Sequence, residues 1–228
     1  MKNWIGLLAV ALLALVTTMT TRAEVVREEN PYILLEKVAK NTFERIEQDR
    51  EKINEDLDHL RVIIRQELLP YVDNVYAAKR VLGRNLKDTT EEQRQEFYTV
   101  FRDYLIATYG RAFTRYDEDK HKVEFADPRR FDGNSRMVEV KTQLIEDGRE
   151  PIRIEFKMRY DDDDKLWKAY DMVVEGVSLL SSKQAEISSV IRSRGIDGTI
   201  ELLREKANEP MQPYEDGAGD LKTGNSSS

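Results

Sequence analysis

The chain has 228 residues, with 36 Lys and Arg against 43 Asp and Glu, which gives a net charge of -7 at pH 7. This acidic balance argues against nucleic-acid binding, because proteins that bind nucleic acid concentrate positive charge on their surface. The sequence contains no cysteine, so disulfide bonds and thiolate metal sites are excluded.

The first 23 residues have the pattern of a secretory signal peptide. Lys2 provides a positive start, residues 5–16 form an apolar run, and Thr21 and Ala23 are small residues at the positions that a signal peptidase reads. A membrane anchor is the alternative, but a membrane-spanning helix needs roughly 20 apolar residues. We predict cleavage after Ala23, export to the periplasm and a mature chain that begins at Glu24. Two positive charges are lost with the signal peptide, which leaves a net charge of about -9.

The first half of the mature chain is predicted to be helical. Asn30 followed by Pro31 is a typical helix start. Pro70 cannot continue a helix, Gly83 favours a helix end, and Thr90 with a glutamine three residues later forms a capping-box pattern. Apolar residues recur at three- and four-residue steps between these signals. The predicted helices cover residues 31–46, 57–68, 72–82 and 90–110.

The period of apolar residues then changes from about 3.6 to 2, which predicts strands. The clearest strand covers residues 152–160, where apolar and charged side chains alternate. Asp147-Gly148 predicts a hairpin turn between this strand and residues 138–144. Strands at 166–174 and 122–125 complete an antiparallel sheet of about four strands. One apolar face of a sheet must be covered, so we predict an α+β fold in which N-terminal helices pack on a curved sheet and C-terminal helices close it.

The last part of the chain is predicted to contain two helices and a tail. One helix ends near Gly195 and the other ends before Pro210. From Asn208 onward Pro, Gly, Asp and Ser dominate, so we predict a disordered tail at residues 208–228. Residues 24–207 are predicted to form a single domain.

Few residues have the type and spacing of a catalytic or metal-binding site. We predict no catalytic residue, metal site or cofactor. His59 and His121 each lack a second plausible ligand at metal spacing. The four aspartates at 161–164 read as a hairpin turn rather than a calcium loop, because the spaced acids and the glycine of that loop are missing. Asp171 is the one candidate base. In a regular strand it would share a face with Trp167 and Ala169, and a structural role is favoured over catalysis.

Several short segments, taken in order, resemble the MlaC-type periplasmic phospholipid-binding proteins, also called the toluene-tolerance family of ABC-transport auxiliary proteins. They are Leu-Leu-Pro-Tyr-Val-Asp at 68–73, Ala-Ala-Lys-Arg-Val-Leu-Gly at 77–83, Trp-Lys-Ala-Tyr-Asp at 167–171 and Glu-Gly-Val-Ser-Leu at 175–179. The likeness covers residues 30–206. One departure is that several relatives carry Tyr-Arg and Phe in the next helix, where this chain has Lys183-Gln184 and Ile187.

The resemblance implies a non-enzymatic shuttle that moves phospholipid between the outer and inner membranes and maintains outer-membrane lipid asymmetry. It also implies two partners: an outer-membrane lipoprotein and porin complex, and an inner-membrane ABC transporter complex with a substrate-binding ring. Two other functions stay open. One is a small periplasmic α+β enzyme with an apolar pocket and Asp171 as base, and the other is a ligand-free envelope adaptor.

A lipid carrier of this kind needs an apolar space between sheet and helices. The apolar strand face is the predicted floor, and residues of three helical segments are the predicted helical side. The alternative is that these faces meet and close a dry core. The predicted lipid-binding residues are Val138, Val140, Ile152, Ile154, Phe156 and Met158 on the sheet, with Val72, Tyr76, Leu105 and Tyr109 on the helices.

Overall fold

The computed structural model describes residues 25–117 and 119–213. The predicted signal peptide and residues 214–228 of the predicted tail lie outside these ranges. The longer helices are α1 (Pro31–Gln48), α2 (Arg50–Glu55), α3 (His59–Ile63), α4 (Asn74–Leu82), α5 (Glu91–Gly110) and α6 (Leu179–Asn208). Shorter helical turns are η1 (Ile64–Leu68), η2 (Leu69–Tyr71), η3 (Gly83–Asp88), η4 (Arg111–Arg115) and η5 (Pro128–Arg130). The strands are β1 (His121–Phe125), β2 (Met137–Glu146), β3 (Ile152–Asp161), β4 (Leu166–Val174) and β5 (Val177–Ser178).

The predicted helix starts are present with their capping bonds. The Asn30 side chain accepts a hydrogen bond from the backbone N–H of Tyr32 at 2.9 Å, ahead of α1. At the start of α5, the Thr90 hydroxyl accepts from Gln93 N–H at 3.2 Å, and the Gln93 side chain accepts from Thr90 N–H at 3.0 Å. These bonds satisfy backbone donors that a helix start leaves unpaired.

Two predicted helices differ from the structure around Pro70. The segment predicted at 57–68 is α3 followed by a π-helical turn, η1, in which Leu69 N–H bonds to the Ile64 carbonyl. Pro70 has no N–H and cannot extend a regular ladder, so the chain changes pitch before it. The helix predicted from Val72 begins at Asn74, because Asp73 caps α4 and Val72 is extended, forming a bridge with Ala169.

The predicted antiparallel sheet is confirmed, in the order β1-β2-β3-β4-β5. The strand β5 is a two-residue addition to the four that were predicted. The hairpin between β2 and β3 turns at Gly148, whose φ of 78° is readily adopted by glycine. Between Lys157 and Met158 the register of β3 with β4 shifts, which is a β-bulge.

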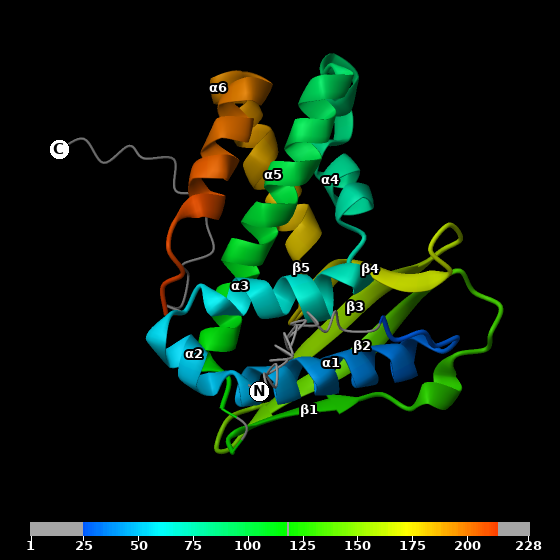
Figure 1. The fold of residues 1–228 in the computed structure, drawn as a ribbon. Coiled ribbons are helices and arrows are strands. Elements are labelled where there is room, and N and C mark those ends of the chain that lie inside the picture. Colours follow the sequence, from blue (N-terminus) through cyan, green and yellow to red (C-terminus); the bar gives the residue numbers. More distant parts are fainter. Residues whose placement is uncertain (1–24, 118, 214–228) are drawn as a thin grey trace, which may run out of the picture.

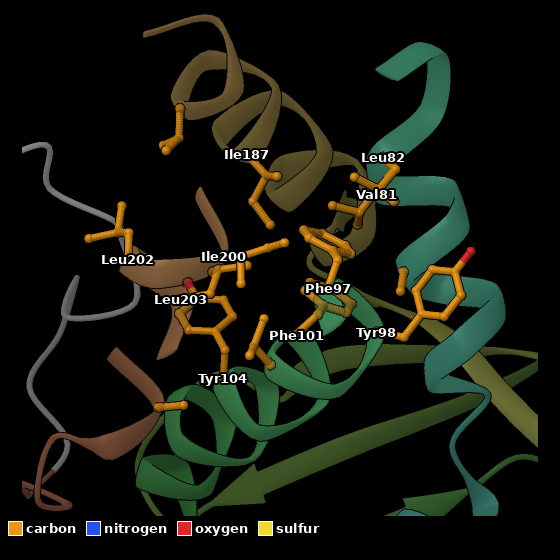
Figure 2. Close-up of a cluster of buried hydrophobic side chains, with 14 of the residues drawn as sticks. Val81, Leu82, Phe97, Tyr98, Phe101, Tyr104, Ile187, Ile200, Leu202 and Leu203 are labelled. Carbon is orange, nitrogen blue, oxygen red and sulfur yellow. The ribbon is translucent and has the colours of Figure 1, made fainter. Parts of the chain in front are cut away.

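Three separate clusters of buried apolar residues hold these elements together. The helix α1 lies across the sheet and shares one cluster with it, and the ends of α1, α2 and α3 form another (Figure 1). The third is the core of a three-helix layer made by α4, α5 and α6. Figure 2 shows Phe97 and Phe101 of α5 in this core with Ile187 of α6, and the two phenylalanine rings are stacked at 5.6 Å.

The predicted break near Gly195 is confirmed inside α6. Gly195 has φ 71° and ψ 179°, so two helical segments meet at a non-helical residue. This region of backbone space is essentially restricted to glycine. The fold also extends beyond the predicted domain end at 207. Met211 is buried, and its N–H bonds to the Asp58 carboxylate at 3.0 Å, so the predicted tail start at Asn208 is too early.

Replacing Gly195 with alanine should therefore destabilise the fold. The expected loss is about 1–3 kcal/mol in the free energy of unfolding, because a side chain is strained at this φ and ψ. Urea unfolding measures it. Ser189→Ala, at an exposed position of the same helix, should change stability by less than about 0.5 kcal/mol. Equal effects of the two substitutions would contradict the role of Gly195.

Candidate functional site

The predicted sheet residues divide into two groups. Val140 and Met158 are both 0% exposed and pack with Tyr32, Leu34 and other residues of α1. Val138 and Phe156 pack against the same cluster from its edge. At this end of the sheet, the predicted floor is therefore the wall of a closed core.

The other end of the same sheet face is less covered. Ile154 lies opposite Val174, and Phe156 lies opposite Met172, so these four side chains share one face. Ile154, Met172 and Val174 are half-buried and belong to none of the three clusters described above. Ile152, at the start of β3, is 37% exposed. Phe156 is half-buried and lies at the boundary, since it also packs against the edge of the α1 cluster. We call Ile154, Phe156, Met172 and Val174 the open sheet face.

Met172 and Val174 were not among the predicted lipid-binding residues. The sequence does contain a pattern that could have identified them, because Met172 and Val174 are two residues apart in β4 and therefore lie on one face of the strand. Once β3 and β4 are paired, this is the face that carries Ile154 and Phe156. The β-bulge prevents this assignment from regular alternation alone. Tyr170 is an extra residue in β4, so residues before and after it that are an even number of positions apart lie on opposite faces. For the same reason the expectation that Asp171 shares a face with Trp167 and Ala169 was wrong: Asp171 lies opposite Lys157.

The predicted residues of the helical side lie where the helical layer joins the sheet. Val72 forms a bridge with Ala169 at the edge of β4. Tyr76 meets Tyr170 edge to face at 5.1 Å, and the Arg159 guanidinium lies 5.0 Å from the Tyr76 ring. Val72 and Tyr76 therefore lie at the contact between the helical layer and β4, which is made by polar and aromatic groups.

Leu105 and Tyr109 lie on the later part of α5. Leu105 packs against the core of the three-helix layer. Burial raises the pKa of Tyr109 to about 12, with smaller effects from Lys183, Tyr104, Glu186 and Asp171. Tyr109 therefore keeps its proton at neutral pH, with its hydroxyl near charged groups of α6 and β4.

Two of those charged groups are buried at the start of α6. Asp171 accepts hydrogen bonds from Leu180 N–H at 3.0 Å and from the Ser178 hydroxyl at 2.8 Å, so both carboxylate oxygens are occupied. Lys183 is 6% exposed and bonds to Glu186 at 2.7 Å. Burial alone would lower the pKa of Lys183, but Tyr104 and Glu186 together raise it above its usual value, so Lys183 stays charged.

A model of the MlaC protein family matches residues 36–205. The chain belongs to the MlaC family. It is 32% identical over 212 residues to the intermembrane phospholipid transport system binding protein MlaC of Haemophilus influenzae, a match that covers 92% of this chain and 96% of that protein. Its fold is similar to that of a phospholipid-binding protein from Ralstonia solanacearum, solved in complex with a phospholipid. That likeness has a TM-score of 0.68 at 21% identity and covers 79% of this chain and 97% of the other.

The remaining candidates have structural partners in this MlaC-family fold. His59 lies 2.9 Å from Asp49, and His121 accepts a hydrogen bond from Asp117 N–H at 3.0 Å. Asp161 accepts from the backbone within the turn and pairs with Lys168. In the described ranges, no three His, Cys, Asp or Glu side chains are grouped as metal ligands. No helix in those ranges is long and apolar enough to cross a membrane.

Two surface pockets, of about 250 and 530 Å³, are lined by none of the ten predicted lipid-binding residues. The larger lies between α5 and the end of α6, and most of the residues around it are polar or charged, with Val100 and Ala207 as the exceptions. The largest incompletely covered apolar surface among the predicted sheet residues is the open sheet face. Its position follows from the pairing of β3 with β4.

Proposed function

We propose that this protein binds phospholipid and carries it through the periplasm between the outer and inner membranes, thereby maintaining outer-membrane lipid asymmetry. Membership of the MlaC family supports this proposal, and so does the likeness to the Haemophilus influenzae protein, an intermembrane phospholipid transport system binding protein. The observation that carries it is the open sheet face. It is apolar and only half-buried, while Val140 and Met158 on the same sheet face are closed over by α1.

The lipid tails would lie between the open sheet face and the side chains of Leu105 and Tyr109. A buried methylene contributes about 0.8 kcal/mol, so roughly 30 methylenes in two tails amount to on the order of 20 kcal/mol. A shallow surface groove cannot offset that cost of exposure to water. The three-helix layer has its own core. Polar contacts between Asp73 and Arg159 and between Leu180 and Asp171 help to join this layer to the sheet. In this proposal the layer moves away from the sheet by breaking these contacts, and its own core stays intact. The other predicted lipid-binding residues would contribute where such movement uncovers them.

Lipid analysis of the natively purified protein tests the proposal. Protein recovered from a Gram-negative periplasm without detergent should release about one phospholipid per chain on organic extraction, measured by mass spectrometry. Delipidated protein should reload from phospholipid vesicles. Absence of phospholipid in both experiments would reject the shuttle and favour the ligand-free adaptor.

The proposed partners are an outer-membrane lipoprotein and porin complex and an inner-membrane ABC transporter complex with a substrate-binding ring. The proposed route also requires export and cleavage after Ala23. The intact mass of the periplasmic protein checks the cleavage site, and transfer of labelled phospholipid to purified inner-membrane complex in vesicles checks the partner.

The contacts of Asp171 favour a structural role over the alternative of an enzyme. Both of its oxygens accept hydrogen bonds that hold the start of α6. Asp171→Ala should therefore lower the free energy of unfolding by about 1–3 kcal/mol, since buried donors lose their acceptor. Thermal unfolding measures this, with Asp163→Ala in an exposed turn as the control. If Asp171→Ala leaves the stability unchanged, the structural role is contradicted and Asp171 is again a candidate catalytic base.

A further inference from the structure

Basic side chains without an ion-pair partner gather at one end of the three-helix layer. Most lysines and arginines in the described ranges pair with a carboxylate, as Arg102 does with Asp103 at 3.2 Å and Arg153 with Glu175 at 3.0 Å. Within those ranges, six exposed basic side chains of this layer have no such pair. We call them the basic end: Lys79 and Arg80 of α4, Arg84 and Lys87 of η3, and Arg192 and Arg194 of α6.

Two long-range hydrogen bonds bring the segments of the basic end together. Gln184 of α6 donates to the Arg80 carbonyl at 2.9 Å. Gln93, at the start of α5, donates to the Asp197 carboxylate at 2.7 Å, just beyond the break at Gly195. The end of α4, η3 and the turn within α6 therefore lie side by side, at the end of the layer that points away from the sheet (Figure 1).

Neighbouring carboxylates do not cancel the charge of the basic end. Those within five residues of one of its members in the chain are Asp88, Glu91, Glu92 and Asp197. Glu91 is already paired with Arg94 at 3.2 Å, so it balances a seventh cation. Positive charges thus outnumber negative ones here, although the whole chain has a net charge of -7. The basic end is a local reversal of charge on an acidic protein.

The basic end is better suited to an extended anionic surface than to a shaped partner. Neither of the two surface pockets is lined by one of its residues. Protein interfaces are anchored by buried aromatic and apolar side chains. Of the large apolar side chains that are exposed in the described ranges, only Val75 lies on α4, and none lies on η3 or α6. Lysine and arginine clusters bind the phosphates of a membrane surface without needing such an anchor.

We propose that the basic end docks this protein on membranes that contain anionic phospholipid. Phosphate groups at the membrane surface supply the negative charge that the basic end lacks. Each Lys or Arg near such a surface strengthens binding roughly fivefold. The basic end therefore turns toward the membrane while the acidic remainder of the protein is repelled. The inference rests on the proposed carrier function, because a carrier must meet membranes, but docking itself does not involve the open sheet face.

Co-sedimentation with vesicles tests this docking. Mature protein purified from the periplasm is mixed with vesicles of phosphatidylcholine, either alone or with about 30% phosphatidylglycerol. At about 25 mM salt, where surface charges are weakly screened, the partition coefficient should be at least tenfold higher on the phosphatidylglycerol vesicles. At about 0.5 M salt this difference should disappear.

Two double substitutions remove charge from different elements of the basic end. One is Arg84→Gln with Lys87→Gln, and the other is Arg192→Gln with Arg194→Gln. Each should lower the partition coefficient on phosphatidylglycerol vesicles by about tenfold or more at low salt, because two cations near the surface are lost. All four side chains are exposed, so a Tm close to that of the parent protein establishes that each variant is folded.

Arg130→Gln with Lys165→Gln is the matched control. Both residues are exposed and have no carboxylate partner in the described ranges, and they lie on η5 and on the turn after β3. This control makes the same change in net charge outside the basic end, so it should change the partition coefficient by less than about twofold. Equal losses in the control and the two test variants would show that only net charge matters, and would overturn the proposal.

Two other results would also overturn it. The first is equal binding of the parent protein to both kinds of vesicle, or no binding to either. The second is binding to the purified inner-membrane complex alone, weakened by the same substitutions, which would assign the basic end to an acidic protein surface. Phospholipid bound per chain is measured separately, so loss of docking is distinguishable from a failure of the proposed carrier function.

Discussion

Replacing Ile154 with aspartate is expected to reduce bound phospholipid by roughly tenfold or more, because a carboxylate on the open sheet face would have to lose its water to contact acyl chains. Ile154 is half-buried and outside the three packed clusters, so the folded protein can keep this carboxylate hydrated when no lipid is bound. Phospholipid per chain after native purification is the measurement. A tryptophan fluorescence and thermal unfolding profile close to that of the parent protein establishes folding.

Gln143→Asp is the matched control for this substitution. Gln143 is exposed on β2 and lies opposite Arg153, on the other face of the same sheet. The Gln143→Asp substitution adds the same charge close to Ile154 but does not change the open sheet face. Bound phospholipid should therefore stay near one molecule per chain. If folded Ile154→Asp protein loads as fully as the control, the tails bind elsewhere and the site assignment is wrong.

The alternation of Ile154 and Phe156 with charged residues was enough to predict the sheet and its apolar face. It could not divide that face into closed and open parts. Met158 continues the same pattern, yet it is fully buried because α1 lies over it, more than 100 residues earlier in the chain. Sequence periodicity reports that a side chain is apolar and which face it occupies. Which other element covers it depends on long-range packing.

The two local irregularities near the site have the same origin. The bulge at Tyr170 inserts one residue into β4 and reverses the parity of Asp171 relative to Trp167. The π-helical turn before Pro70 places Glu67 in the smaller of the two surface pockets, beside α1. Neither follows from the spacing of apolar residues alone, because both change a regular period by one residue. The bulge also lies where the sheet joins the helical layer.

Asp73 is the residue whose loss should most weaken the joint between the helical layer and the sheet. Its carboxylate caps α4 by accepting from Tyr76 N–H at 3.0 Å and also pairs with Arg159 of β3. Its own N–H donates to the Ala169 carbonyl at 2.8 Å. The Asp73 side chain is 10% exposed, and that of Arg159 is 33% exposed, so part of the ion pair is screened by water.

Asp73→Ala is therefore expected to lower the free energy of unfolding by about 2–3 kcal/mol, with about 1 kcal/mol from the cap and the rest from the ion pair. For a domain of this size, Tm should fall by about 5–10 °C. Asp73→Asn separates the two contributions, since its amide oxygen can still cap α4 while the charge is gone, and it should cost about half as much. Equal losses for Ala and Asn would show that the cap contributes nothing. Parent-like stability of both variants would show that the helical layer is held by its apolar contacts alone, and the proposed movement of that layer away from the sheet would then require those contacts to break.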